Sequence, residues 1–329
     1  MTAIIVQPGA ATRRTPVIMT ALLIISLPVL LVATEAVSYY AENRPDGIIV
    51  SSGEQRGYLL HVPTSYDRAK PASLVISMHG AAVGPRQQMQ MSGWNRLSDA
   101  EGFIVAYPAG TTNNGPRIWR VEWGGGLARD VRFISALIDT LEATYNIDPA
   151  RIYANGLSNG GGMTFALSCT LRGRIAAFGM VGAAQTLPFS WCPDRGPAPV
   201  IAFNGTADPM IPYKGGVSLV SPRAFPDVVT WTRNWARRNG CSDTPVDSTV
   251  AATVARLEFV DCAGDAGVVL YTIKGGGHTW PGGEPLPEWG VGPTSTAIDA
   301  TRVMWAFFQA HPLRATAATP RRDQGNVPR

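Results

Sequence analysis

The chain has 329 residues, of which 45% are hydrophobic and 16% are charged. This apolar content, with 9% aromatic residues, excludes a mostly disordered chain. The formal net charge is +4, and no stretch rich in Lys and Arg recurs with interleaved aromatic residues, so nucleic-acid binding has little support. The length allows one large domain or two small ones.

An apolar segment near the N-terminus predicts export. Residues 15–34 carry no charge, and two arginines directly precede them, which is the form of an export signal. Because Pro28 weakens a long membrane-spanning helix, we favour the interpretation that residues 1–36 form a cleaved signal peptide. The alternative is an uncleaved membrane anchor formed by residues 17–33. Either form predicts a secreted or periplasmic protein.

The C-terminal residues 313–329 have no apolar periodicity and predict a disordered tail. Residues 43–312 remain, and a segment of this size fits one α/β domain better than two.

Strand and helix patterns alternate along this domain. Strands are expected over residues 57–62, 72–78, 103–107, 151–155, 178–183, 200–203 and 268–273. Helices are expected over residues 91–100, from a capping Asp130 to Tyr145, over 163–167 and over 296–310. This alternation predicts an α/β fold with a mostly parallel central sheet and helices on both faces.

The sharpest local motif is Gly-Leu-Ser-Asn-Gly at residues 156–160, between an expected strand and an expected helix. In this context G-x-S-x-G predicts a tight turn that exposes a nucleophilic serine, here Ser158. An ordinary capping serine at a glycine-rich helix start is the alternative interpretation.

A serine nucleophile needs an adjacent base, and the chain has four histidines. His61 lies inside a strand pattern, His311 ends the last helix, and His79 precedes a glycine in a backbone-shaping position. His278 follows a strand and a glycine-rich loop, which is where a catalytic imidazole is presented. We therefore predict His278 as the base.

The imidazole needs an acid to orient it, and Asp208 follows the strand at 200–203. Asp227 and Asp261 are alternatives, but neither follows a buried strand as directly. The order Ser, Asp, His along the chain is that of the α/β-hydrolase fold. For the oxyanion hole we predict the backbone N–H groups of Asn159 and Ala81.

Other chemistries lack their motifs. The chain has no H-E-x-x-H or comparable His pair, no G-K-[ST] and no G-x-G-x-x-G opening a first βαβ unit. The cysteine spacings match no metal site. We expect neither a metal nor another cofactor.

An export signal and an even number of cysteines predict disulfides. Four cysteines allow three pairings, and we favour the sequential pairs, Cys169 with Cys192 and Cys241 with Cys262. Four buried free thiols are the alternative.

Several motifs in order resemble the secreted polyhydroxybutyrate depolymerase / feruloyl esterase group, related to carbohydrate esterase family 1 in the α/β-hydrolase superfamily. They are MHG ending at Gly80, GWNRLSDAEGFIVAYP from Gly93, RIYANGLSNGGG from Arg151, NGTADPMIPY from Asn204, NGC ending at Cys241 and GGGHTWPGG from Gly275. The resemblance implies a carboxylic ester hydrolase with Ser158, Asp208 and His278 as its triad. The chain departs from the family pattern at Asn204, where His is common, and at residues 118–123, which lack the family's Cys.

The resemblance implies a small or oligomeric ester as the partner: feruloyl or acetyl esters of plant polysaccharide, or hydroxybutyrate oligomers. We expect Trp119, Trp123 and Trp280 to form a flat apolar wall for the acyl group. No membrane contact is expected beyond the possible anchor, and the oligomeric state stays open. A secreted acyltransferase on the same fold is the alternative function, whereas the intact Ser, Asp and His argue against a non-catalytic binding module.

Overall fold

The computed structural model describes residues 44–112, 115–122, 124–184, 187–218 and 220–314. The structural unit discussed below begins at Pro45. The expected export segment lies outside the described residues, as does Trp123. In the described part of the chain, no helix is long and apolar enough to cross a membrane.

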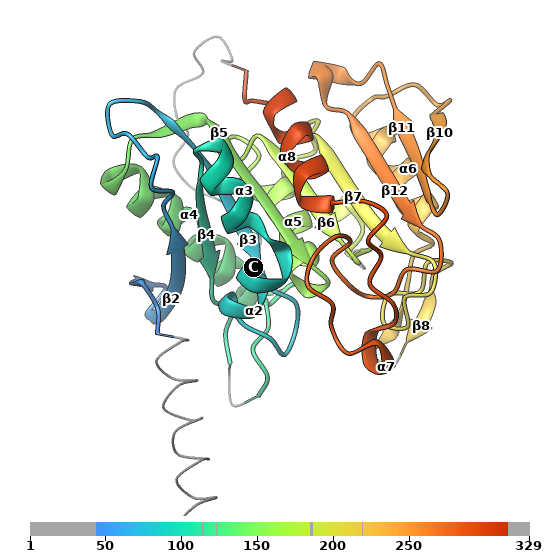
Figure 1. Ribbon diagram of the computed structural model, residues 1–329, viewed down its shortest axis with the longest axis horizontal. Helices are drawn as coiled ribbons and strands as arrows, with labels where there is room; N and C mark the ends of the chain where they lie inside the picture. Colours follow the sequence, from blue (N-terminus) through green and yellow to red (C-terminus); the bar gives the residue numbers. More distant parts are fainter. Residues whose placement is uncertain (1–43, 113–114, 123, 185–186, 219, 315–329) are drawn as a thin grey trace, which may run out of the picture. The chain divides into compact units, whose positions relative to one another are not determined.

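One large sheet organises this unit (Figure 1). Among the described residues, ten strands form it in the order β1-β2-β4-β3-β5-β6-β7-β12-β11-β10. The adjacent strands β4, β3, β5, β6, β7 and β12 are parallel, and antiparallel strands flank them at both ends. The strands are β1 (Gly47–Ser51), β2 (Glu54–His61), β3 (Ala72–Met78), β4 (Ile104–Pro108), β5 (Ile147–Leu157), β6 (Ala177–Val181), β7 (Val200–Gly205), β10 (Val246–Ala251), β11 (Val254–Phe259) and β12 (Val268–Ile273). A separate pair consists of β8 (Gly216–Ser218) and β9 (Ser221–Phe225).

Helices follow the strands as the α/β pattern requires. They are α2 (Pro85–Ser92), α3 (Trp94–Glu101), α4 (Gly125–Thr144), α5 (Asn159–Thr170), α6 (Val228–Arg238), α7 (Glu288–Val291) and α8 (Ala300–Ala310), with short 3-10 turns η1 (Phe189–Trp191) and η2 (Ala263–Asp265). The expected mostly parallel sheet in an α/β fold is thereby confirmed.

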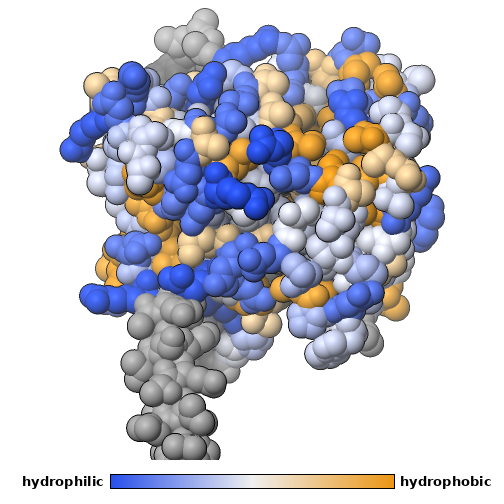
Figure 2. Space-filling model, in the orientation of Figure 1, coloured by the Kyte–Doolittle hydropathy of each residue, from blue (hydrophilic) through white to orange (hydrophobic). Residues whose placement is uncertain are grey.

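The sheet is covered on both faces because its central strands are apolar on both. Every residue of β3 and β4 is buried, and successive side chains enter opposite layers. Leu74 and Ile76 pack in the cluster that contains α4, α5 and α6, while Val75 packs in the cluster that contains α2, α3 and α8. In the view of Figure 2, the hydrophobic residues that remain on the surface are scattered among hydrophilic ones.

Several helix boundaries differ from the sequence expectation. The helix predicted over residues 91–100 is in fact two helices, α2 and α3, separated at Gly93 with φ 67°. Asp130 does not cap its helix, because α4 begins at Gly125 and Asp130 is fully buried inside it. Its Oδ1 accepts a hydrogen bond of 2.6 Å from Nη1 of Arg56, and its Oδ2 one of 2.7 Å from the backbone N–H of Arg120.

The C-terminal helix also starts later than predicted. It begins at Ala300, and Asp299 caps it by accepting the backbone N–H of Arg302 at 3.0 Å. Leu313, assigned to the expected tail, donates its backbone N–H to Ala150 at 2.8 Å. Residues 315–329 of that tail lie outside the described residues.

Candidate active site

Ser158 lies in a strained turn between β5 and α5. Its backbone has φ 54° and ψ −118°, a conformation that residues other than glycine rarely adopt. The glycines on both sides permit the turn: a Cβ on Gly156 would lie 2.4 Å from the carbonyl carbon of Gly160, and one on Gly160 would lie 2.3 Å from the carbonyl oxygen of Met78. The N–H of Ser158 donates to the carbonyl of Val181 at 2.8 Å, which anchors the turn to the end of β6.

His278 and Asp208 meet across two adjacent loops. Nδ1 of His278 lies 2.8 Å from Oδ2 of Asp208, and both side chains are buried. The loops approach closely, and glycine stands on both sides of the contact: the N–H of Ala207 donates to the carbonyl of Gly276 at 2.9 Å. A Cβ on Gly205 would lie only 2.1 Å from the same oxygen.

Asp208 is itself held in place. Its Oδ1 accepts the backbone N–H groups of Met210 and Ile211, each at 2.8 Å, which leaves Oδ2 for the imidazole. Of the two alternative acids, Asp227 caps α6 by accepting the N–H of Thr230 at 2.9 Å. Asp261 lies in a turn with φ 55°. Asp208 is thus the carboxylate that the structure pairs with His278.

The end of β6 lies between the serine turn and the His–Asp pair. Gly182 follows Val181, and a Cβ on Gly182 would lie 3.1 Å from Nδ1 of His278 and 3.5 Å from Oδ2 of Asp208. Strands β5, β6, β7 and β12 are neighbours in the sheet (Figure 1), so their carboxyl ends meet at one edge. The three residues predicted from sequence therefore gather at this edge.

The two predicted oxyanion donors lie in segments next to Ser158. Asn159 is the first residue of α5, and the N–H of a first helical residue has no acceptor within the helix. On the opposite side, a Cβ on Gly80 would lie 3.5 Å from the Cβ of Ser158, so the turn that contains Ala81 approaches Ser158 directly.

His79 is a structural neighbour of the site. Its Nδ1 lies 2.7 Å from the carbonyl of Gly80, and its Nε2 accepts the backbone N–H of Gly110 at 2.9 Å, so Nδ1 carries the proton. Burial lowers the pKa of His79 to about 4. The side chain is therefore neutral at pH 7 and holds two loops together.

The other two histidines are remote from Ser158 in their contacts. His61 lies 2.8 Å from Oδ1 of Asp99, and Nδ1 of His311 lies 2.7 Å from the carbonyl of Phe307 at the end of α8. Both contacts agree with the structural roles expected for these residues.

The structure describes two of the three tryptophans of the predicted wall, Trp119 and Trp280, and both are buried. Trp119 is 1% exposed and Trp280 is 0% exposed. Their indole N–H groups donate to the carbonyl of His79 at 3.0 Å and to Oγ1 of Thr301 at 2.8 Å, respectively. Because neither ring has a free face, we assign both side chains to the packing of the protein interior. The sequence alone did not reveal that they are buried.

Both favoured disulfides are present. Cys169 pairs with Cys192, and Cys241 pairs with Cys262. The alternative of free thiols is wrong, since no cysteine in the described residues is unpaired. The first bond ties the end of α5 to the segment after η1, behind the serine turn.

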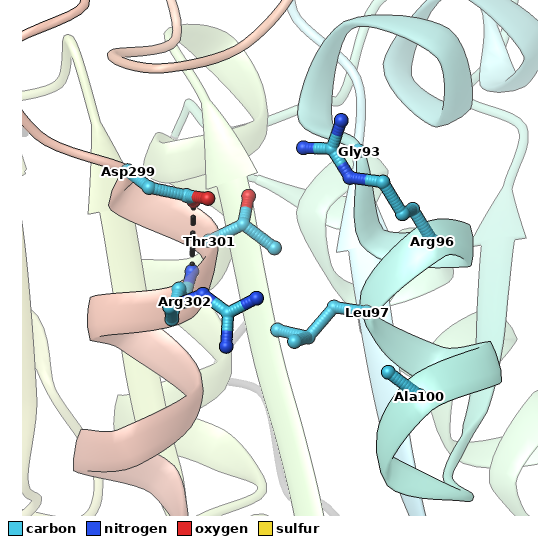
Figure 3. Close-up of a pocket in the computed structure, with 7 residues that line it drawn as sticks. All are labelled: Gly93, Arg96, Leu97, Ala100, Asp299, Thr301 and Arg302. Carbon is cyan, nitrogen blue, oxygen red and sulfur yellow. Dashed lines mark hydrogen bonds between the residues drawn. The ribbon is translucent and has the colours of Figure 1, made fainter.

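A pocket of about 100 Å³ lies between α3 and α8 (Figure 3). Gly93, Arg96, Leu97, Ala100, Asp299, Thr301 and Arg302 line it. None of the predicted site residues is among them, so this pocket is distinct from the serine turn.

Comparisons with known proteins find similar esterases. A family model described as esterase PHB depolymerase matches residues 57–189. Feruloyl esterase C of Emericella nidulans is 31% identical over 263 residues, which cover 78% of this chain and 84% of that protein. Feruloyl esterase B of Piromyces equi is also 31% identical, over 229 residues that cover 68% of this chain but only 42% of that protein.

Among solved structures, the acetyl xylan esterase of Aspergillus awamori matches with a TM-score of 0.57 and 17% identity, over 79% of this chain and 98% of that one. At this identity the likeness concerns the fold, and it agrees with the α/β-hydrolase expectation. The extent of the match to feruloyl esterase C decides the family. The chain belongs to the family of serine carboxylic ester hydrolases that includes feruloyl esterase C and the PHB depolymerase esterases.

Proposed function

We propose that this protein hydrolyses carboxylic esters through an acyl-enzyme on Ser158. The observation that carries the proposal is the buried hydrogen bond between His278 and Asp208, at the same edge of the sheet as a serine held in a strained turn. Asp208 keeps the proton of the imidazole on Nδ1, which leaves Nε2 to accept a proton. This is the arrangement that a serine hydroxyl needs to become a nucleophile.

In the first step, Nε2 of His278 takes the hydroxyl proton while Oγ of Ser158 attacks the ester carbonyl. The alcohol leaves with the proton from His278, and the acyl group stays on Ser158. Water then attacks the acyl carbon with His278 again as the base, and the carboxylic acid departs. The N–H groups of Asn159 and Ala81 stabilise the oxyanion in both steps, and the N-terminus of α5 adds its positive dipole end.

As substrate we propose feruloyl or acetyl esters on plant polysaccharide. This choice is supported by the names of two sequence relatives, feruloyl esterase C and a bifunctional acetylxylan esterase/xylanase. The family model is named for PHB depolymerase, which favours hydroxybutyrate oligomers as the second candidate. We propose a secreted or periplasmic location, because two disulfides fit an oxidising compartment.

The test compares purified protein with its Ser158→Ala variant on p-nitrophenyl acetate, methyl ferulate and a hydroxybutyrate oligomer. We expect hydrolysis by the wild type and loss of at least about 1,000-fold in kcat for the variant. Higher kcat/KM on methyl ferulate than on the oligomer supports the first substrate class, and the reverse supports the second. Full activity in Ser158→Ala would contradict the proposed acyl-enzyme mechanism.

A further inference from the structure

The two predicted oxyanion donors come from different parts of the chain. One N–H belongs to Asn159 at the start of α5, and the other belongs to Ala81 in the turn after β3. An oxyanion hole works only when its donors are held at the correct spacing before the reaction starts. Some element must therefore connect these two segments.

The side chain of Asn159 grips the backbone of Trp119 at two points. Its Oδ1 accepts the N–H of Trp119 at 2.6 Å, and its Nδ2 donates to the carbonyl of Trp119 at 3.1 Å. The side-chain amide thus forms the same pair of hydrogen bonds that a neighbouring strand would form. These bonds fix residue 119 relative to the serine turn. Asn159 is one residue after the nucleophile, so this contact is adjacent to the reaction site.

The ring of Trp119 contacts the other donor segment. Its indole N–H donates to the carbonyl of His79 at 3.0 Å, and its ring centroid lies 5.3 Å from that of His79. His79 in turn bonds to the carbonyl of Gly80 through its own ring. Trp119 therefore touches both segments that supply the predicted donors, through its backbone on one side and its ring on the other.

The far side of this connection is also anchored. Arg120 donates its backbone N–H to Oδ2 of Asp130 at 2.7 Å, and its guanidinium contacts both Asp130 and Glu54. Because Asp130 is fully buried, residue 119 is held from behind as well as from the serine side. Residues 119 and 120 are thus held by hydrogen bonds on both sides.

We propose that Trp119 is a strut, held by the side chain of Asn159, that sets the spacing of the two oxyanion donors. The proposal rests on the proposed function and adds two positioning roles to it. Trp119 positions the donors through its contacts with His79 and Asn159. The side chain of Asn159 holds Trp119, and this role is separate from that of the backbone N–H of Asn159 as an oxyanion donor. The strut predicts that its loss weakens binding of the transition state and leaves binding of the ester ground state nearly unchanged.

Two variants remove one end of the strut each. Asn159→Ala removes the grip on the backbone of Trp119 but keeps the N–H at residue 159. Trp119→Phe removes the indole N–H but keeps most of the buried ring. If Asn159→Ala does not fold, Trp119→Phe carries the test alone.

The chain offers matched controls for both variants. Asn239 grips Ala198 in the same way, with its Oδ1 accepting the N–H at 3.0 Å and its Nδ2 donating to the carbonyl at 2.8 Å. Trp235 is fully buried and donates its indole N–H to the carbonyl of Ala198 at 2.8 Å. Asn239→Ala and Trp235→Phe therefore remove the same kinds of bond away from Ser158.

The measurements are kcat and KM on p-nitrophenyl acetate, Ki for phenylboronic acid, which forms a tetrahedral adduct with an active serine, and the melting temperature. We expect Asn159→Ala and Trp119→Phe to lower kcat by roughly 10- to 100-fold and to raise Ki similarly, with KM within about twofold. The double variant should lose less than the product of the two single losses, because both changes break one strut. The controls should lower only the melting temperature.

If the two strut variants behave like their controls, with kcat and Ki unchanged, the strut is wrong although the esterase assignment stands. If the wild type hydrolyses no ester, the proposed function fails first. Equal rises in KM and Ki would also overturn the strut, since they would indicate a general loss of ligand binding.

Discussion

Oδ2 of Asp208 lies 2.8 Å from Nδ1 of His278, and the other oxygen of the same carboxylate accepts two backbone N–H groups. The carboxylate is therefore oriented by the loop after β7 before it meets the imidazole. In the proposed mechanism, this buried carboxylate orients His278 and stabilises the cation that forms during the reaction.

Asp208→Asn should lower kcat by about 10,000-fold, because an amide donor facing Nδ1 favours the wrong tautomer of His278. Steady-state hydrolysis of p-nitrophenyl acetate measures the effect. Asp227→Asn is the control, since Asp227 only caps α6. It should cost about 1 kcal/mol of stability or less and leave kcat unchanged. Similar kcat values for both variants would contradict the assignment of Asp208.

Gly182→Ala should disturb the base. A Cβ there lies 3.1 Å from Nδ1 of His278, and the backbone has φ 53°, which a residue with a side chain tolerates poorly. We expect kcat to fall roughly tenfold or more, with about 1–2 kcal/mol lost from the free energy of unfolding. Gly173→Ala adds a Cβ with nothing within 4 Å and should change neither quantity strongly. An unchanged kcat in Gly182→Ala would show that His278 is free to move without cost.

His79 should make the protein less stable in mild acid. Burial lowers its pKa from 6.5 to about 4 in the folded state, so the unfolded chain binds the proton more tightly. The stability contributed by neutral His79 is complete above pH 6.5 and is lost progressively as the pH falls toward 4, by roughly 3 kcal/mol. Urea unfolding at a series of pH values measures this loss. His79→Gln, which cannot titrate, should show a shallower decline over the same range, and an identical decline would rule out His79 as its source.

The disulfide between Cys241 and Cys262 should contribute stability without affecting catalysis. It closes a loop of 21 residues, which in the chain-entropy model corresponds to roughly 3 kcal/mol. The double variant Cys241→Ala, Cys262→Ala should lose about that much in urea unfolding while kcat at 25 °C stays within about twofold. A loss of kcat larger than the loss of folded protein would show that this bond shapes the site.

The sheet and the positions of the three site residues were predictable because each signal is local. Ser158, Asp208 and His278 each follow a buried apolar strand, and parallel neighbouring strands end at one edge of the sheet. Their convergence therefore follows from topology once the fold class is correct. The break between α2 and α3 was less predictable, because a single Gly93 with positive φ separates two otherwise continuous helical patterns.

What sequence reasoning missed depends on contacts between distant residues. Asp130 looked like a helix cap, but Arg56 and Arg120, brought by other elements, place it in a buried salt-bridge network. Trp119 looked like part of a substrate wall, but its ring is buried and its backbone is hydrogen-bonded to Asn159, forty positions away. No local pattern encodes either pairing, since each forms only when the sheet is assembled.

The most direct test of the central claim is covalent labelling of the nucleophile. The protein is incubated with a fluorophosphonate, an ester analogue that phosphonylates activated serines, and the modified peptide is identified by mass spectrometry. We predict one label per chain, on Ser158, with loss of esterase activity in proportion to labelling and no label in Ser158→Ala. A label on another residue, or full activity in a protein labelled at Ser158, would contradict the account.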